Sequence, residues 1–137
     1  MKAPIYILSI CFLVTEVSAQ EAESGFRAGP TMAVQEASLK DGIRLTDKAK
    51  EVIGVETRKI GSSPFAAPTA ALVHFGNRIG VYRFRNNWFK LIEIKVISKK
   101  ENSVTFSAAE LKDNDQIVIA GVALLRVSEM DAFGGEE

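Results

Sequence analysis

Cysteine and histidine are almost missing from this sequence, since its 137 residues include one of each. A lone cysteine, Cys11, cannot form a disulfide within the chain, and it lies in an N-terminal stretch that we expect to be removed. His74 has neither a cysteine nor a second histidine with which to complete an ordinary zinc site. We therefore expect His74 to be a structural or surface residue, and we predict no metal site and no thiol chemistry.

The sequence has no excess of either charge, because 17 lysines and arginines balance 17 aspartates and glutamates. Nucleic-acid-binding proteins usually carry a marked basic excess, so this balance argues against that class. The neutrality hides two blocks of opposite charge. Residues 78–100 hold seven basic residues and one acidic residue, whereas residues 101–137 hold two basic and eight acidic residues.

The apolar stretch of residues 5–14 falls well short of the roughly 20 residues that a membrane-spanning helix needs. It follows the basic Lys2 and precedes a V-S-A sequence ending at Ala19, a pattern typical of a cleaved signal peptide. We predict cleavage after Ala19 and a periplasmic location. Two alternatives are an uncleaved anchor and lipid attachment at Cys11, which the bulky Ile10 before it disfavours.

Glycine, proline and small polar residues favour flexibility at both ends of the mature chain. We predict a flexible leader over residues 20–32, one β domain over residues 33–127 and a flexible tail over residues 128–137. The mature chain's two methionines, Met32 and Met130, fall in these flexible ends. Thioethers bind Cu(I) and Ag(I), so metal capture by the two ends is an alternative to plain tail residues.

One helix is predicted, over residues 46–54. Thr46 can accept hydrogen bonds from the free amides at the helix start, and Gly54 can adopt the left-handed conformation that ends a helix. Three apolar residues have the spacing of one buried face: Ala49, Val52 and Ile53.

Alternating and β-branched stretches predict strands in most of the remaining chain. These strands cover residues 55–60, 70–75, 81–85, 89–97, 104–106 and 116–120. Asn86-Asn87 tolerates positive φ and is typical of a hairpin turn. In the strand before it, Tyr82 and Phe84 face one side and Arg83 and Arg85 the other. We expect a mainly β fold, a small antiparallel β-roll or barrel-like domain with one short helix.

The basic block and its hairpin supply the candidate partner-binding residues, which are Arg83, Arg85, Trp88, Phe89 and Lys95. Arginine and aromatic residues are enriched at protein interfaces, and a basic surface attracts acidic loops or anionic lipid head groups. The alternative is a solvated outer face whose charge is met by Glu93 and by the acidic turn of residues 110–115. Trp88 has the further alternative of a place in the core.

No catalytic constellation is recognisable in the sequence. The hydroxyls of Ser62, Ser63 and Ser107 have no identifiable histidine or aspartate partner and no nucleophile elbow. Asp113-Asn114-Asp115 lacks the remaining ligand positions of a calcium loop, so we expect a turn before a strand. We therefore predict a non-enzymatic protein without a cofactor.

Two stretches of the chain are similar to a known family. Residues 43–57 (IRLTDKAKEVIGVET) resemble a segment of the periplasmic adaptor subunits, or membrane fusion proteins, of RND-type efflux pumps. That segment has an L-T pair, a short helix and an I-G-V-x-T sequence. Residues 71–125 resemble the C-terminal part of the family's membrane-proximal domain, with a turn at Asp115, an apolar strand, Gly121 and Leu124-Leu125 in the same order.

The chain departs from the family between these two stretches. In the family, the intervening chain forms a lipoyl-like domain, a coiled-coil hairpin and much of a β-barrel, whereas residues 58–70 alone join the two stretches here. The family's membrane-proximal domain is assembled from both ends of its chain, so a short loop could close the domain at little entropic cost. Two glycine positions of the family are Glu110 and Asn114 here, and asparagine can still adopt the left-handed conformation of a turn.

The resemblance implies a periplasmic accessory protein that consists of the membrane-proximal domain alone and lies near the membrane surface. Such a protein would dock on an RND-type inner-membrane pump or on a full-length adaptor and aid the assembly or regulation of transmembrane efflux. One alternative is a small periplasmic module that binds a metal or small ligand through Met32, Met130 or His74. Another is an adaptor remnant without a function of its own.

Overall fold

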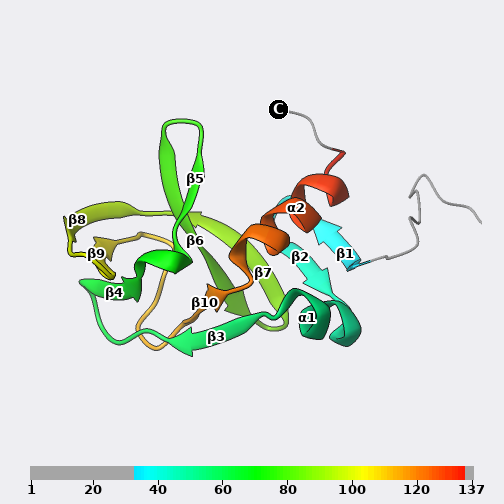
Figure 1. The fold of residues 1–137 in the computed structure, drawn as a ribbon, viewed down its shortest axis with the longest axis horizontal. Coiled ribbons are helices and arrows are strands. Elements are labelled where there is room, and N and C mark those ends of the chain that lie inside the picture. The colour runs from blue at the N-terminus through cyan, green and yellow to red at the C-terminus, as the bar shows by residue number, and fades with distance from the viewer. Residues whose placement is uncertain (1–32, 135–137) are drawn as a thin grey trace, which may run out of the picture.

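The computed structural model describes residues 33–134, which form two antiparallel sheets and two α-helices (Figure 1). Neighbouring strands of the large sheet are, in order, β1 (Val34–Ser38), β2 (Gly42–Leu45), β7 (Trp88–Glu93), β6 (Arg78–Arg85), β10 (Gln116–Ala120) and β3 (Glu56–Lys59), and β5 (Val73–Phe75) also pairs with β6. The small sheet has the order β4 (Phe65–Pro68), β9 (Ser103–Ser107) and β8 (Lys95–Lys99). The helices are α1 (Asp47–Ile53), the 3₁₀ turn η1 (Thr69–Ala71) and α2 (Val122–Ala132).

The predicted mainly β, antiparallel fold is confirmed, and the two sheets are not closed into a barrel. The predicted signal peptide, the leader with Met32, and Cys11 lie outside the described residues, as do residues 135–137 of the predicted tail. No helix within residues 33–134 is long and apolar enough to span a membrane.

Helix α1 begins and ends where the sequence predicts. The Thr46 hydroxyl accepts a hydrogen bond of 3.1 Å from the Ala49 N–H, and Gly54 ends the helix with a φ of 73°. Ala49 is buried, but the predicted inward position of Val52 is wrong, because 70% of that residue is exposed.

The hairpin of β6 and β7 fixes which side chains share a face of the large sheet. Its turn residues, Asn86 and Asn87, both have positive φ, as the sequence predicts. Directly paired residues lie on the same face, so Val81 and Ile92 point to one side while Tyr82 points to the other.

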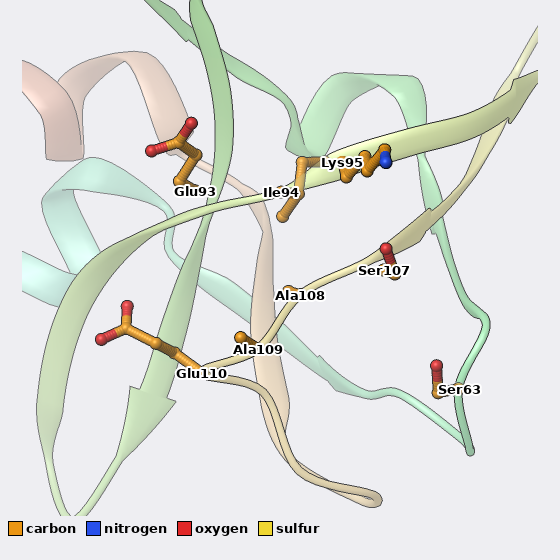
Figure 2. Close-up of a pocket in the computed structure, with 8 residues that line it drawn as sticks. All are labelled: Ser63, Glu93, Ile94, Lys95, Ser107, Ala108, Ala109 and Glu110. Carbon is orange, nitrogen blue, oxygen red and sulfur yellow. The ribbon is translucent and has the colours of Figure 1, made fainter.

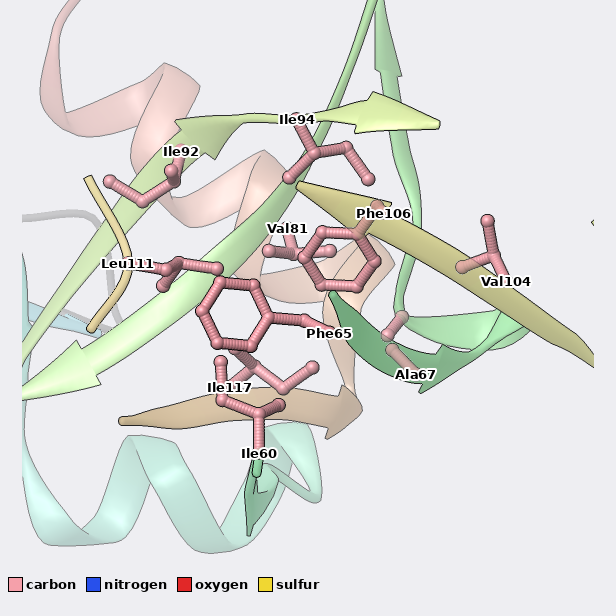
Figure 3. Packing of buried hydrophobic residues seen from close by; sticks show 11 residues of the cluster. Ile60, Phe65, Ala67, Val81, Ile92, Ile94, Val104, Phe106, Leu111 and Ile117 are labelled. Carbon is pink, nitrogen blue, oxygen red and sulfur yellow. The ribbon is translucent and has the colours of Figure 1, made fainter. Parts of the chain in front are cut away.

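Each face of the large sheet covers its own apolar cluster. Between the two sheets, the large sheet contributes Val81, Ile92 and Ile117, which pack with small-sheet residues (Figure 3). There the Phe65 and Phe106 ring centroids are 5.9 Å apart. On the opposite face, residues of β6, β7 and β10 pack with residues of β2, α1 and α2: Tyr82, Phe89, Val118, Ile43, Leu45, Ala49, Val122 and Leu125.

The predicted strand over residues 89–97 is two strands in the structure. β7 belongs to the large sheet and β8 to the small sheet, and Ile94 lies between them with its N–H donating to the Ile79 carbonyl. Ile94 is buried in the cluster between the sheets. At this residue the chain passes from the large sheet into the small sheet.

α2 is a second α-helix, whereas the sequence predicts a single one, and it begins within the predicted β domain. The predicted flexible tail from Ser128 is wrong for residues 128–132, which belong to this helix. Buried residues recur along this helix at Val122, Leu125 and Glu129. Glu129 can lie in the interior because its carboxylate accepts hydrogen bonds from Tyr82 and Arg126.

Several shorter elements also differ from the predictions. The predicted strand over residues 70–75 is a 3₁₀ turn followed by the short β5, and the strands β1, β2 and β4 were not predicted. β4 consists of Phe65, two alanines and a proline, a composition with little strand propensity. Its strand conformation comes from pairing with β9 along its whole length.

Candidate functional site

One face of the large sheet carries a group of basic residues around the single tryptophan. Arg83 pairs with Lys90 and Arg85 pairs with Trp88 across the hairpin. The pairing of Ile43 with Phe89 places Arg44, the next residue, on the same face as Trp88. We call these residues the arginine–tryptophan face: Arg44, Arg83, Arg85, Trp88 and Lys90.

A row of side chains crosses the large sheet on this face. The Arg44 guanidinium lies 4.6 Å from the centre of the Trp88 ring and 3.4 Å from the Glu36 carboxylate. On the other side of Trp88, Arg85 binds Asp115 with two hydrogen bonds, from Nε to Oδ1 at 3.2 Å and from Nη2 to Oδ2 at 2.5 Å. In order across the sheet, the row consists of Glu36, Arg44, Trp88, Arg85 and Asp115.

Asp115 is held in its ionised form by this arrangement. Burial on its own would raise the pKa of the carboxyl, but the hydrogen bonds from Arg85 and from the Lys112 N–H outweigh it and leave the pKa below its usual value. The Lys112 N–H donates at 2.8 Å, so the same carboxylate also closes the turn before β10.

A second row joins the hairpin to the loop between β9 and β10. Arg83 Nη1 donates to the Glu110 carbonyl at 3.1 Å, and Lys90 Nζ lies 3.4 Å from the Glu110 carboxylate. Burial, together with the neighbouring charge of Arg85, lowers the pKa of the Arg83 guanidinium. Glu110 thus lies between two basic side chains that would otherwise repel each other.

The charge of the basic hairpin is accordingly met largely within the molecule. Glu110 and Asp115 do this, and Glu93 pairs with Arg78 at the start of β6 at 3.6 Å, as the solvated-face alternative requires. Such partly exposed ion pairs hold side chains in place more than they add stability.

The structure brings together three of the five predicted partner-binding residues. Arg83, Arg85 and Trp88 share the arginine–tryptophan face and are half-buried. The prediction for Phe89 is wrong, because it is 1% exposed and its ring packs 4.7 Å from that of Phe84 in the core. Strand alternation explains this, since Phe89 must face away from Trp88.

Lys95 lies apart from the other candidates, at the start of β8 in the small sheet. It borders an open hollow of about 520 Å³ where β7 passes into β8 (Figure 2). The other lining residues are Ser63, Glu93, Ile94, Ser107, Ala108, Ala109 and Glu110. Both acidic residues of the hollow already form ion pairs, Glu93 with Arg78 and Glu110 with Lys90.

Arg44 and Lys90 belong to this face but are not among the predicted partner-binding residues. The alternation of Ile43, Arg44 and Leu45 indicates that Arg44 leaves the core, but nothing in the sequence places β2 beside β7. Lys90 alternates with Phe89 in the same way, so strand period is the one sequence feature that could have identified it.

The residues considered for metal binding are spread over two elements. His74 is exposed on β5, and Met130 is 40% exposed on α2. Within residues 33–134, no three histidine, cysteine, aspartate or glutamate side chains are grouped closely enough to hold a metal ion.

A buried polar cluster fastens α2 to the large sheet. The Tyr82 hydroxyl donates to Glu129 Oε2 at 2.5 Å, and Arg126 Nη1 donates to the same oxygen at 2.6 Å. Burial and the hydrogen bond to Glu129 raise the pKa of Tyr82 well above its ordinary value. The tyrosine therefore stays a neutral donor, and the cluster serves to position α2.

The chain was also compared with known proteins. No protein-family model matches the sequence, and no match was found among curated proteins or among solved structures.

Proposed function

We propose that this chain is a non-enzymatic, periplasmic accessory protein that docks on an RND-type efflux pump or on a full-length periplasmic adaptor. Its resemblance to the adaptor's membrane-proximal domain supports this role. Docking would aid the assembly or regulation of the pump complex.

One observation carries the proposal: the two stretches that resemble the adaptor family pair with each other. β2, from the first stretch, pairs with β7 through Ile43 and Phe89. β3, which begins in the first stretch, pairs with β10 through Thr57 and Val118. The resemblance implies that these stretches form one domain, and their pairing supports that reading.

The short join between the stretches has its own place in this domain. It supplies the end of β3 and the whole of β4, which pairs with β9 in the small sheet. Residues 58–70 therefore complete the second sheet, which fits a protein built from the docking domain without the family's extended arm.

A pull-down tests the proposal. The full chain with a C-terminal affinity tag is produced in the cells that encode it, cross-linked in the envelope, and recovered together with its neighbours. We expect mass spectrometry to identify an RND-type pump or an adaptor at several times its level with a control bait.

The control bait is the variant Ile117→Asp, which places a charge in the core between the sheets and should not fold. Enrichment of neither pump nor adaptor over this bait, in repeated cross-linked preparations, would overturn the proposal.

A further inference from the structure

Strand β8 lies at the end of the small sheet and pairs with β9 on one side only. All five of its residues are exposed, and within residues 33–134 no strand pairs with its other edge. In Figure 1 it lies at the left of the molecule, at the end opposite to α1 and β1. Backbone N–H and C=O groups on such an edge are available to another extended chain.

Free positive charge gathers along this edge. Lys95 and Lys99 belong to β8 and Lys100 follows it, and none of the three has a carboxylate within 4.0 Å among residues 33–134. This distinguishes β8 from the arginine–tryptophan face, where Arg44, Arg85 and Lys90 each contact an acidic side chain.

The strand also exposes apolar surface. Val96 is 36% exposed and Ile97 58% exposed. A bulge lies here, because the register of β8 on β9 shifts between Val96 and Ser98 and leaves Ile97 without a paired residue. Among the edge strands of residues 33–134, β3 is the other one whose residues are all exposed, and it carries Glu56, Thr57, Arg58 and Lys59 with no apolar side chain to offer.

The bulge gives the two lysines different faces of the small sheet. Lys95 pairs with Ser107, and Lys99 pairs with the buried Val104. Ser107 and Val104 are three residues apart on β9 and so point to opposite faces. A segment laid along β8 meets a lysine on each face.

We propose that β8 binds an extended acidic segment of a partner protein as an additional strand. Backbone hydrogen bonds along the free edge would hold the segment, Val96 and Ile97 would contact its apolar side chains, and Lys95 and Lys99 would pair with its carboxylates. The inference deepens the proposed docking function and rests on it for the identity of the partner.

Charge also selects against a second copy of this chain. Two β8 strands side by side would bring the lysines of both copies together, and like charges across a strand pair are destabilising. The same lysines therefore reject a basic or identical edge and accept an acidic one.

The test uses the full chain and two synthetic peptides, one repeating Glu-Glu-Val-Val and the other repeating Lys-Lys-Val-Val, so that each carries charged and apolar side chains on both faces of a strand. We expect the glutamate peptide to bind, to shift the NMR signals of β8 and to slow hydrogen exchange of its amides. We expect the lysine peptide not to bind.

The double variant Lys95→Glu/Lys99→Glu should weaken binding of the glutamate peptide about tenfold or more. The matched control, Arg58→Glu/Lys59→Glu, makes the same charge change on the exposed strand β3 and should leave binding nearly unchanged. Circular dichroism checks that both variants fold.

Three outcomes would overturn the inference: no binding of the glutamate peptide, equal losses in the two variants, or self-association of the chain through β8. Its failure can be separated from failure of the proposed function. A pump or adaptor recovered equally with the wild type and with Lys95→Glu/Lys99→Glu would leave the docking function intact and reject β8 as its contact.

Discussion

At the residue scale, the Tyr82 hydroxyl is a buried group held by a hydrogen bond to a carboxylate. Tyr82 is 0% exposed, and its hydroxyl shares Glu129 Oε2 with Arg126. Removing the hydroxyl by Tyr82→Phe leaves a buried carboxylate with one donor fewer. We expect a loss of about 1–2 kcal/mol in the free energy of unfolding, measured by urea denaturation at neutral pH.

The raised pKa of Tyr82 predicts a pH dependence on the alkaline side. Its pKa is higher in the folded protein than in the unfolded chain, where tyrosine ionises near pH 10. The stabilisation is therefore fully present below about pH 10 and is lost as the pH rises further, by at most about 1.4 kcal/mol per pH unit. Urea titrations from neutral to alkaline pH should show this slope in the wild type, and an equal slope in Tyr82→Phe would contradict it.

The opposite sign applies to Asp115, whose pKa is lowered in the folded protein. Its contribution is present above the unfolded pKa, near 4, and is lost as the pH falls through the folded value. Asp115→Asn should cost about 1 kcal/mol at neutral pH and flatten the acid limb of the stability curve. Asp113→Asn, at an exposed position two residues earlier, is the control. It should leave the stability at neutral pH and the acid limb of the stability curve unchanged.

Phe89 and Trp88 show how much of the site the sequence could predict. The alternation of the hairpin correctly separates Arg83 and Arg85 from Tyr82 and Phe84. The same rule separates Trp88 from Phe89, which a grouping by aromatic character at a hairpin tip overlooks. The partners of these residues, Arg44 and Glu110, come from other strands and loops, and that pairing depends on tertiary contacts.

At the scale of elements, the two helices differ in how far local sequence determines them. α1 has a capping threonine and a terminating glycine, so the sequence suffices to predict its bounds, although not the exposure of Val52. α2 begins after Gly121 without a side-chain cap, and one of its three buried positions is a glutamate. Its inward face can be recognised only when Tyr82 is known to lie opposite Glu129, and that contact depends on the tertiary structure.

The buried face of α2 predicts that two adjacent leucines contribute very differently to the free energy of unfolding. Leu125 is 0% exposed in the cluster with Tyr82 and Phe89, whereas Leu124 is 54% exposed. Leu125→Ala should lower the free energy of unfolding by about 2–5 kcal/mol. Leu124→Ala should change it by no more than about 0.5 kcal/mol. Equal effects in urea denaturation would show that α2 does not pack on the sheet through this face.

At the scale of the whole molecule, the large sheet is shared by two cores. Ile117 and Val118 are neighbours on β10, yet Ile117 packs between the sheets and Val118 packs in the cluster with the helices. Both are 0% exposed. Because β10 contributes residues to both clusters, neither cluster can unfold without removing part of the packing surface of the other.

This sharing predicts a single cooperative unfolding transition. Ile117→Ala should cost about 2–5 kcal/mol, and Val118→Ala less because its side chain is smaller. Both should shift the midpoint of one common curve, with far-ultraviolet circular dichroism and Trp88 fluorescence coinciding in each variant. Circular dichroism reports on both sheets, while Trp88 lies on the large sheet alone. If Ile117→Ala separated the two curves, the small sheet would be unfolding independently, and the two sheets would be separate folding units joined at Ile94.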